Sequence, residues 1–549
     1  MTQMATRKLR RPFGTGISHP LAGSPWPGGI AAGMVWLVPL AAAAGLARSA
    51  TGVNLSGVWH DPYIRGVLLF TLWQATLSTL LSVAFAVPVA RALHRRGNHP
   101  GRRWFLALAG LAFVTPSIVA IFGIAAVHGH SGYVNQGLAL LGVDGGYYLY
   151  GLTGILIAHT FFNLPLAARV FLQGLQSVPP ETWRLAAQLG MRSRDILRII
   201  EWPVLRALLP GVAGIIFLLT FTSFAVVLTL GGGPRATTLE VAIYQSLRMD
   251  FDIPRAISLS LLQVTVCALL FLCFGRYART MQLAPSAGRD FSRPDTAGRA
   301  ARRSDLIVLT VFLLWIAAPL LAVIVGAVSE VRWPWLVDRE LWSATLGTLS
   351  VALPAALIAT GLALPMALLI KDLRTYRQAR LGADLIELSG SLVLAMPPLV
   401  LGAGLFLAVR GFADVFTVGP WLVVAVNALL ALPFALRILI PAVRDSAQQT
   451  DRLCASLGLK GWRRLRVVGW PLLRAPLGLT LALCAALSTG DLSVIALFGS
   501  QDFNTLPMLI YRLMGAYRMA DAATTAVILV GLSLLLFRAF ERGVGGRRA

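Results

Sequence analysis

Long apolar runs, each followed by a short polar or basic segment, alternate along the whole chain. A helix needs about 20 apolar residues to cross the ~30 Å hydrocarbon core of a bilayer. Twelve runs are of roughly that length, and we expect each to form a membrane-spanning helix. They lie near residues 30–48, 66–92, 105–128, 150–175, 207–230, 254–275, 305–328, 345–370, 384–409, 419–443, 475–498 and 521–540. The pattern predicts an all-α polytopic membrane protein with six spans in each half.

A polar segment in the middle of the chain separates the two sets of spans. Residues 281–303 are rich in Arg, Ser, Ala and Gly, a composition typical of a flexible linker. The expected organisation is an N-terminal tail (1–28), a first transmembrane domain (29–280), the linker (281–303), a second transmembrane domain (304–541) and a C-terminal tail (542–549). An even number of spans per half gives both domains the same orientation, which predicts parallel repeats about an axis along the membrane normal.

Two polar segments, one in each half, repeat each other without a gap. Residues 179–206 read PPETWRLAAQLGMRSRDILRIIEWPVLR, and residues 447–474 read AQQTDRLCASLGLKGWRRLRVVGWPLLR. The similarity continues into the flanking spans, where Thr71 matches Thr348, Pro88 matches Pro365, Thr115-Pro116 resembles Met396-Pro397, and Ile243-Tyr244 matches Ile510-Tyr511. The halves are therefore copies of one module. A polar loop present in both copies indicates a docking function.

Composition and charge support the membrane interpretation. The chain is 56% hydrophobic and only 13% charged, too apolar for a soluble fold of ordinary core size. Its formal net charge of +24 would suggest a nucleic-acid partner in a soluble protein. Here Lys and Arg gather instead in alternate loops, at residues 7–11, 95–103, 184–206, 276–303, 371–380 and 452–466, whereas 129–149 has none. This positive-inside pattern predicts cytoplasmic termini and cytoplasmic duplicated loops, and it argues against nucleic acid.

The residues of the duplicated loops predict two short helices joined by a tight turn. Gly190 and Gly458 allow the positive backbone angle that such a turn needs. In the first copy, Ser193 can cap a second helix that runs through Ile200, and Trp202-Pro203 is expected to end it. The second copy follows the same plan, with a helix through Val468.

Small side chains give each loop a shallow surface that a partner's groove could accept closely. These residues are Ala186, Ala187, Cys454 and Ala455. A single loop of this kind would also suit an amphipathic segment lying on lipid headgroups. Two such loops in register favour docking of a partner.

Polar residues inside apolar spans mark candidate positions on a translocation pathway, because each is costly in hydrocarbon. Asp491 lies in the eleventh run, and Ser223 occupies the matching position of the first half. His159 and Asn427 also match each other, and Asn163 lies one turn from His159. The alternative role for these groups is hydrogen bonding between helices, which is common in membrane proteins.

No catalytic, metal or cofactor site is expected. His128 and His130 lack a third ligand, and the four cysteines have no CxxC spacing. The lysines, Lys8, Lys371 and Lys460, do not lie in a GxxxxGK[ST] phosphate-binding loop. The chain therefore has no ATPase site of its own, and any ATP-driven activity must use a separate subunit.

The loops resemble the EAA loop of ABC importer permeases, whose short helix fits a cleft of the cytoplasmic ATPase subunit. The resemblance rests on Ala186, Gly190 and Pro203 in the first copy and on Cys454, Gly458 and Pro471 in the second. Both copies depart from the common form, since Arg184 and Arg452 replace its Glu and Cys454 replaces an Ala.

Four longer stretches resemble permeases of the thiamine transporter family with two fused transmembrane domains. They are HTFFNLPLAAR (159–169), LAAQLGMRS (185–193), LTLGGGPRATTLEVAIYQSL (228–247) and GDLSVIALFGSQDFNTLP (490–507). The resemblance implies a type I ABC importer permease in the bacterial inner membrane, without a cofactor. It also implies two ATPase subunits on the loops and a periplasmic binding protein that delivers thiamine or its phosphates.

Other functions remain open from the sequence. A ferric-ion or polyamine importer would have the same architecture, and a functional binding protein of known ligand would separate these from a thiamine importer. A secondary transporter driven by an ion gradient would make the duplicated loops accidental. A membrane enzyme is the weakest alternative, because catalytic groups do not cluster in either leaflet.

Overall fold

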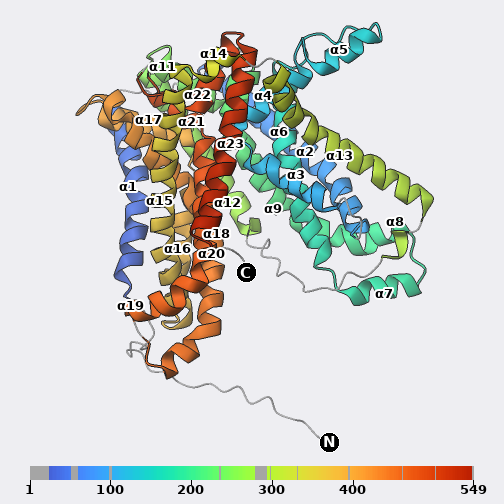
Figure 1. Cartoon of the computed structure of the whole chain (residues 1–549), viewed down its shortest axis with the longest axis vertical. Coiled ribbons are helices and arrows are strands. Elements are labelled where there is room, and N and C mark those ends of the chain that lie inside the picture. Colours follow the sequence, from blue (N-terminus) through green and yellow to red (C-terminus); the bar gives the residue numbers. More distant parts are fainter. Residues whose placement is uncertain are drawn as a thin grey trace, which may run out of the picture.

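The computed structural model describes residues 24–50, 60–97, 102–233, 236–278, 293–296, 298–329, 332–393, 396–459, 461–500 and 502–546. Its regular elements in these ranges are helices. Eleven of the described helices are long and apolar enough to cross a membrane. The predicted all-α polytopic fold is thus confirmed, and Figure 1 shows the helices gathered into two bundles side by side.

The two halves contain corresponding series of helices. The first comprises α1 (Trp26–Ser49), α2 (Pro62–Arg95), α3 (Arg102–Val114), α4 (Ser117–His128), α5 (Tyr133–Leu140), α6 (Leu152–Gln176), α7 (Pro180–Gln188), α8 (Ser193–Ile196), the π-helical turn η2 (Leu197–Glu201), α9 (Trp202–Phe221), α10 (Ala225–Leu230), α11 (Leu239–Arg248) and α12 (Ile253–Ala278). The short 3₁₀ helix η5 (Pro294–Thr296) follows. The second comprises α13 (Arg299–Ser329), α14 (Trp333–Leu336), α15 (Arg339–Thr375), α16 (Arg380–Leu392), α17 (Pro398–Val409), α18 (Val415–Ser456), α19 (Gly461–Arg464), the π-helical turn η7 (Leu465–Gly469), α20 (Trp470–Thr489), α21 (Ser493–Phe498), α22 (Leu506–Gly515) and α23 (Met519–Gly543).

Four of the predicted spans are broken, and the expectation of continuous helices was wrong for them. The run 105–128 forms α3 and α4, and the run 384–409 forms α16 and α17. The run 207–230 forms α9 and α10, and the run 475–498 forms α20 and α21. Prolines explain the first two breaks, because Pro116 and Pro397 occupy the N-cap positions of α4 and α17. Proline disfavours helical geometry in the residue before it, so a new helix starts there.

The first helix of each half packs on the other half. Helix α1 lies against α15 and α17, while α13 lies against α2 and α4 (Figure 1). Glycines allow both close approaches: a Cβ on Gly404 of α17 would collide with the backbone of Ala42, and one on Gly123 of α4 would collide with the carbonyl of Pro319. Because Gly123 and Gly404 each lie seven residues after a matched proline, the two contacts are pseudo-symmetric.

A pair of matched hydrogen bonds also records the duplication. The Thr71 hydroxyl accepts a hydrogen bond from the backbone N–H of Leu239 at 3.1 Å. In the second half, the Thr348 hydroxyl accepts one from the N–H of Leu506 at 2.9 Å. The first bond joins α2 to the N-terminus of α11, and the second joins α15 to the N-terminus of α22, so the copies share tertiary contacts as well as sequence.

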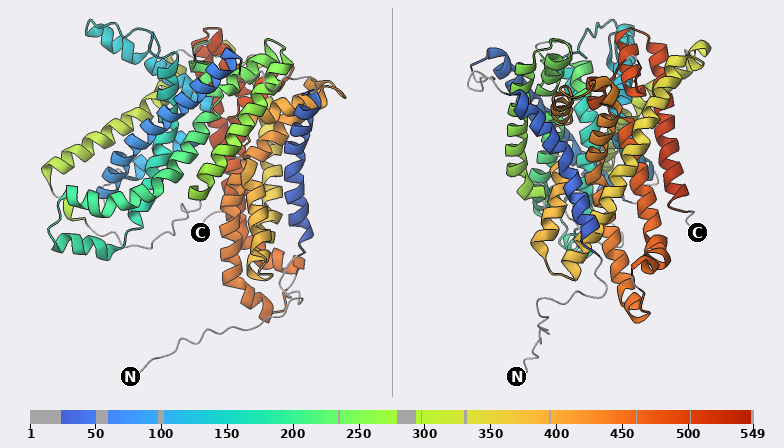
Figure 2. Two further views of the ribbon diagram at one scale, coloured as in Figure 1. Left: turned by 180° about the vertical axis from the view of Figure 1, so that it is seen from behind. Right: turned by 90° about the vertical axis from the view of Figure 1, so that its left-hand side faces the viewer.

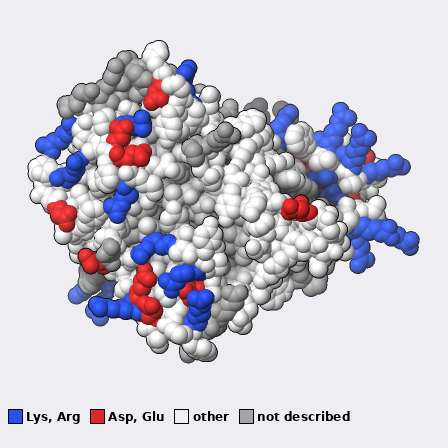
Figure 3. All heavy atoms as spheres, turned by 90° about the horizontal axis from the view of Figure 1, so that it is seen from above, with Lys and Arg blue, Asp and Glu red and all other residues white. Residues whose placement is uncertain are grey.

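The two ends of the molecule differ in charge. Both duplicated loops project from the same end, at separate places (Figure 2). Seen from the opposite end, acidic and basic side chains lie side by side on one part of the surface, a mainly basic group lies at the opposite edge, and the surface between them is mostly uncharged (Figure 3). Arg512 and Glu340 are 3.1 Å apart at that end, and Arg518 lies 2.7 Å from Asp521. This balance agrees with the scarcity of net positive charge predicted for these loops.

Candidate functional site

The turn of each duplicated loop has the same backbone geometry. Gly190 and Gly458 both have φ of +61°, as predicted from their positions. The Met191 N–H donates to the Ala186 carbonyl at 3.0 Å, and the Leu459 N–H donates to the Cys454 carbonyl at 2.9 Å. These are the six-to-one bonds of a Schellman motif, which ends a helix with a glycine in the left-handed conformation.

Some of the small residues of the loops are buried and others are exposed. Ala186 and Cys454 are buried, Ala186 within a small cluster with Trp183, Ile196 and Ile200. Ala187 and Ala455, like Gly190, Gly458, Pro203 and Pro471, are exposed. Ala186 and Cys454 are therefore not part of the exposed surface of each turn, but lie buried beneath it.

Exposed leucines form part of the outer surface of each turn; the sequence placed Leu185 and Leu189 on one helix face, and Leu453 and Leu457 in the second copy, but they were not among the predicted docking contacts. Leu189 is 65% exposed and Leu457 is 64% exposed, and Leu185 and Leu453 lie one turn earlier on the same helices, also exposed. Leucines four residues apart share a helix face. Their spacing in an otherwise Arg-rich segment was the signal that could have identified them.

Two local predictions for the first loop were wrong. Ser193 does not cap α8: Arg192 is the N-cap residue, and the Asp195 carboxylate accepts a hydrogen bond from its N–H at 3.1 Å. Trp202 and Pro203 begin α9 and do not end the preceding helix. Proline is well tolerated in the first turn of a helix, where its missing N–H would have no intrahelical partner.

Asp491 and Ser223 both lie in helix breaks near the middle of the molecule. Ser223 separates α9 from α10, and Asp491 separates α20 from α21. The Asp491 carboxylate accepts hydrogen bonds from the N–H groups of Ser493 at 3.1 Å and Val494 at 3.3 Å. It therefore caps the N-terminus of α21, where negative charge is favoured by the helix dipole.

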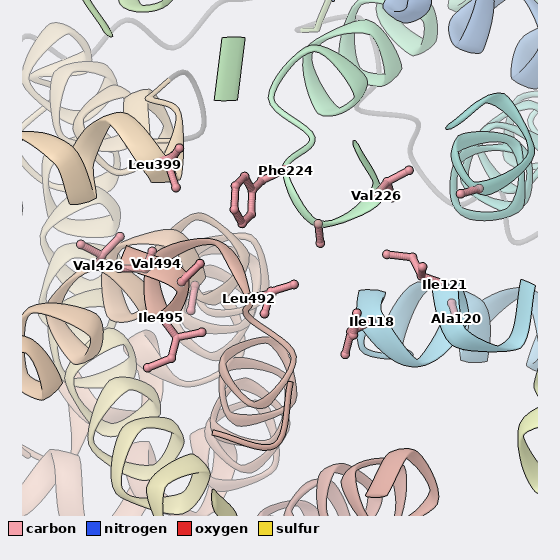
Figure 4. Packing of buried hydrophobic residues seen from close by; sticks show 14 of the residues in the cluster. Ile118, Ala120, Ile121, Phe224, Val226, Leu399, Val426, Leu492, Val494 and Ile495 are labelled. Atoms are coloured by element: carbon pink, nitrogen blue, oxygen red, sulfur yellow. The ribbon is translucent and has the colours of Figure 1, made fainter. Parts of the chain in front are cut away.

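Apolar side chains directly follow these breaks. Phe224 and Leu492, which come after Ser223 and Asp491, lie between Leu399 of α17 on one side and Ile118 of α4 on the other (Figure 4). All four are at most 2% exposed. The helices that carry them also meet across the halves: a Cβ on Gly490 would lie 3.1 Å from the Cα of Pro116. We call Ile118, Phe224, Leu399 and Leu492 the central apolar cluster.

The remaining polar candidates join helices within each half. The Ser78 hydroxyl and His159 Nδ1 are 2.9 Å apart, linking α2 to α6. Asn427 Nδ2 donates to the Ser488 hydroxyl at 3.1 Å, linking α18 to α20. Asn163 is buried on α6, one turn from His159. For His159 and Asn427 the structure provides the helix-to-helix contact that the sequence left as the alternative role.

The structure has two pseudo-symmetric helical bundles, broken helices that meet near the centre, and paired loops at one end. Together these features define a membrane transport permease. Comparison with known proteins specifies the family. The chain is 42% identical over 537 residues to the thiamine transport system permease protein ThiP of Brucella abortus (strain 2308), covering 97% of this chain and 98% of that protein. It therefore belongs to the thiamine transport system permease family.

A second thiamine permease agrees with this assignment, and a more distant relative is a permease named for another substrate. The thiamine transport system permease protein of Escherichia coli (strain K12) is 42% identical over 516 residues, covering 94% of this chain and 96% of that protein. A putative 2-aminoethylphosphonate transport system permease protein of Salmonella typhi is 25% identical over 265 residues, covering 45% of this chain and 95% of that protein. No family model matches the chain.

Proposed function

We propose that this chain is the membrane-spanning subunit of an ABC importer that carries thiamine or its phosphates across the bacterial inner membrane. The observation that carries the proposal is the 42% identity to a thiamine permease over 97% of the chain. The buried apolar centre between two pseudo-symmetric bundles is consistent with alternating access to a shared pathway. No feature of the described residues favours a ferric-ion or polyamine substrate.

The two duplicated loops are the proposed docking sites for a pair of ATPase subunits in the cytoplasm. Their identical glycine turns and exposed leucines support this role, because each presents the same apolar ridge to a partner. The arginines of both loops support, by the positive-inside rule, a cytoplasmic position for the loops and for both termini. The opposite end would then receive the periplasmic binding protein.

The central apolar cluster is the proposed gate. Large apolar side chains that meet in a pore exclude water and ions, and separation of the halves by ATP-driven movement of the loops would open it. Asp491 lies next to the gate residue Leu492. The negative charge of its carboxylate is the proposed contact for the cationic ring of thiamine when the halves separate.

Charge placed on the apolar ridges tests the docking role. We expect the double variant Leu189→Glu with Leu457→Glu to lose association with the ATPase subunits, since a buried unpaired charge at a contact is costly. Leu381→Glu is the matched control, because Leu381 is an exposed leucine of α16 outside the loops. Copurification of the ATPase with the double variant at the level of the control would contradict the proposal.

A further inference from the structure

Residues 293–296, near the end of the predicted linker, are packed against the first bundle, whereas residues 281–292 of that linker lie outside the described residues. Arg293, Pro294, Asp295 and Thr296, which we call the linker clamp, lie between α2 and the first duplicated loop, and Arg293 is only 4% exposed. A buried guanidinium requires charged and polar partners. Its contacts therefore identify what the linker holds.

Arg293 contacts the first loop at two points. Its Nη1 lies 2.8 Å from Glu201 Oε1, at the end of the loop. Its guanidinium carbon lies 4.6 Å from the ring centroid of Trp183, on α7. The same Nη1 is 2.6 Å from His94 Nδ1, near the end of α2. One side chain thus joins both ends of the loop to a membrane-spanning helix.

Asp295 adds a third contact with the loop. Its carboxylate accepts two hydrogen bonds from Arg293, both at 3.0 Å, and one from the Ser193 hydroxyl at 3.2 Å. Arg95 of α2 lies 3.5 Å away. Burial raises the pKa of the Asp295 carboxyl, but Arg293, with Arg95, outweighs this effect and holds the pKa below its ordinary value.

The ends of α2 and α13 complete the network. Arg91 of α2 pairs with Glu201 at 2.6 Å. Asp305 of α13 lies 3.1 Å from Arg95 and 3.0 Å from Arg96, and Arg96 also donates to the Thr296 carbonyl at 3.1 Å. The first loop, α2, the linker and α13 are therefore connected by buried or partly buried ion pairs.

Within the described part of the chain, the second loop differs at the positions that match the clamp's partners, and its Asp451 pairs instead with Arg464 of the same loop. The second copy has different residues at the three matching positions: Glu201 is replaced by Gly469, Trp183 by Asp451 and Ser193 by Gly461. Counting from the matched prolines Pro88 and Pro365, Lys371 replaces His94 and Asp372 replaces Arg95, and these two second-half residues pair with each other at 2.6 Å.

The two loops also differ in how they join the membrane. Helix α6 ends at Gln176, and α7 starts only at Pro180, so the helix is interrupted before the first loop. Helix α18 runs from Val415 to Ser456 without interruption and forms the start of the second loop itself. On the C-terminal side both loops continue into a membrane helix, the first through α8, η2 and α9. On the N-terminal side only the second loop has a continuous helix, so side-chain contacts must fix the start of the first loop.

We propose that the linker clamp supplies these contacts: it positions the first loop against α2 and α13, while the second loop moves with the continuous α18. This inference rests on the proposed docking function of the loops. It makes the two ATPase contacts mechanically unequal, and it assigns Arg293 a positioning role in the coupling of ATP hydrolysis to transport.

Spin labels on the two loops test the clamp without the ATPase. Single cysteines at Leu189 and Leu457, introduced after replacing the four native cysteines, would report loop mobility by electron paramagnetic resonance in nanodiscs holding the full chain. Arg293→Ala should mobilise the label at 189 and leave the label at 457 unchanged. Arg303→Ala is the matched control, because it removes an exposed arginine at the linker end of α13. Arg293→Lys keeps the charge but loses the two-pronged contact with Asp295, and it should mobilise position 189 to a lesser extent.

Two results would overturn the inference. The first is a label at 189 that is no more mobile in Arg293→Ala than in the Arg303 control. The second is equal mobilisation at 189 and 457 in both Arg293 variants, which would indicate general loosening.

Binding of the ATPase subunit then tests the underlying docking function separately. Its apparent affinity should fall about tenfold in Arg293→Ala, if about a tenth of the loops keep the competent orientation. A mobilised loop with unchanged ATPase affinity would contradict the docking function while leaving the clamp in place.

Discussion

Gly190 and Gly458, 268 residues apart in the sequence, have the same φ of +61° and end the same hydrogen-bonded turn. A Cβ at either position would meet no other atom within 4 Å. The glycines are therefore required by backbone conformation and not by lack of space. Residues that adopt a positive φ readily should therefore be tolerated at these positions, whereas residues that do not should be destabilising.

Gly190→Asn and Gly190→Val should behave differently. Asn adopts left-handed backbone angles readily, whereas a β-branched residue does so at a cost of about 1–2 kcal/mol. We expect the Val variant, and the same change at Gly458, to reduce coupled transport strongly, and the Asn variants to stay near wild type. Transport assays on membranes with equal amounts of inserted permease would measure this. Equal loss in the Asn and Val variants would mean that the glycine surface itself matters.

Asp491→Asn separates charge from capping. Asn also caps helices, so α21 should stay intact, whereas Asp491→Ala should lose about 1 kcal/mol. We expect Asp491→Asn to lower thiamine uptake while ATPase association is preserved. Asp414→Asn is the control, because Asp414 caps α18 through the N–H groups of Phe416 and Thr417 in the same way. An uptake rate unchanged by Asp491→Asn would remove this carboxylate from the pathway.

Phe224→Ala should open a leak through the centre. The change removes the largest side chain of the central apolar cluster and, as a buried Phe truncation, should cost about 3–5 kcal/mol of stability. Phe171→Ala makes the same truncation at a fully buried site of α6 outside the cluster. Flux of a small dye or ion from proteoliposomes, without ATP, should rise only in the Phe224 variant. Comparable leakage from both variants would indicate loss of stability and not loss of a gate.

Ser78→Ala tests whether His159 acts in structure or transport. The substitution removes the hydrogen bond between α2 and α6 and should lower stability by about 0.6 kcal/mol, the typical value for such bonds in membranes. We expect the concentration of substrate complex that gives half-maximal transport to stay the same. Thermal unfolding and transport kinetics would be measured on the same preparation. A changed half-maximal concentration at unchanged stability would place His159 on the pathway.

The sequence predicted features that depend on short segments. Apolar run length gave the helical membrane fold, and the matched Leu-Gly pairs gave the turns at Gly190 and Gly458. Hydropathy could not predict the helix breaks beside Ser223 and Asp491, because the residues on both sides of each break are apolar. Only Gly490, at the end of α20, was a local signal for one of these two breaks, whereas Pro116 and Pro397 marked the breaks before α4 and α17.

Contacts between distant segments were beyond sequence reasoning. The placement of α1 on the second half depends on close approach between Gly45 of α1 and Gly404, and the glycines of α1 do not indicate which helix they contact. The linker clamp was missed for a related reason. Arg293 and Asp295 lie in a segment whose composition is typical of flexible linkers, and their partners Glu201 and His94 lie far away in the sequence.

Uptake of labelled thiamine into proteoliposomes most directly tests whether this chain is an ATP-dependent thiamine permease. The chain would be reconstituted with and without its ATPase subunit and binding protein, at saturating ATP. We expect uptake only when both partners are present. Uptake without ATP, or a complete system that transports other ligands but not thiamine, would contradict the proposed function.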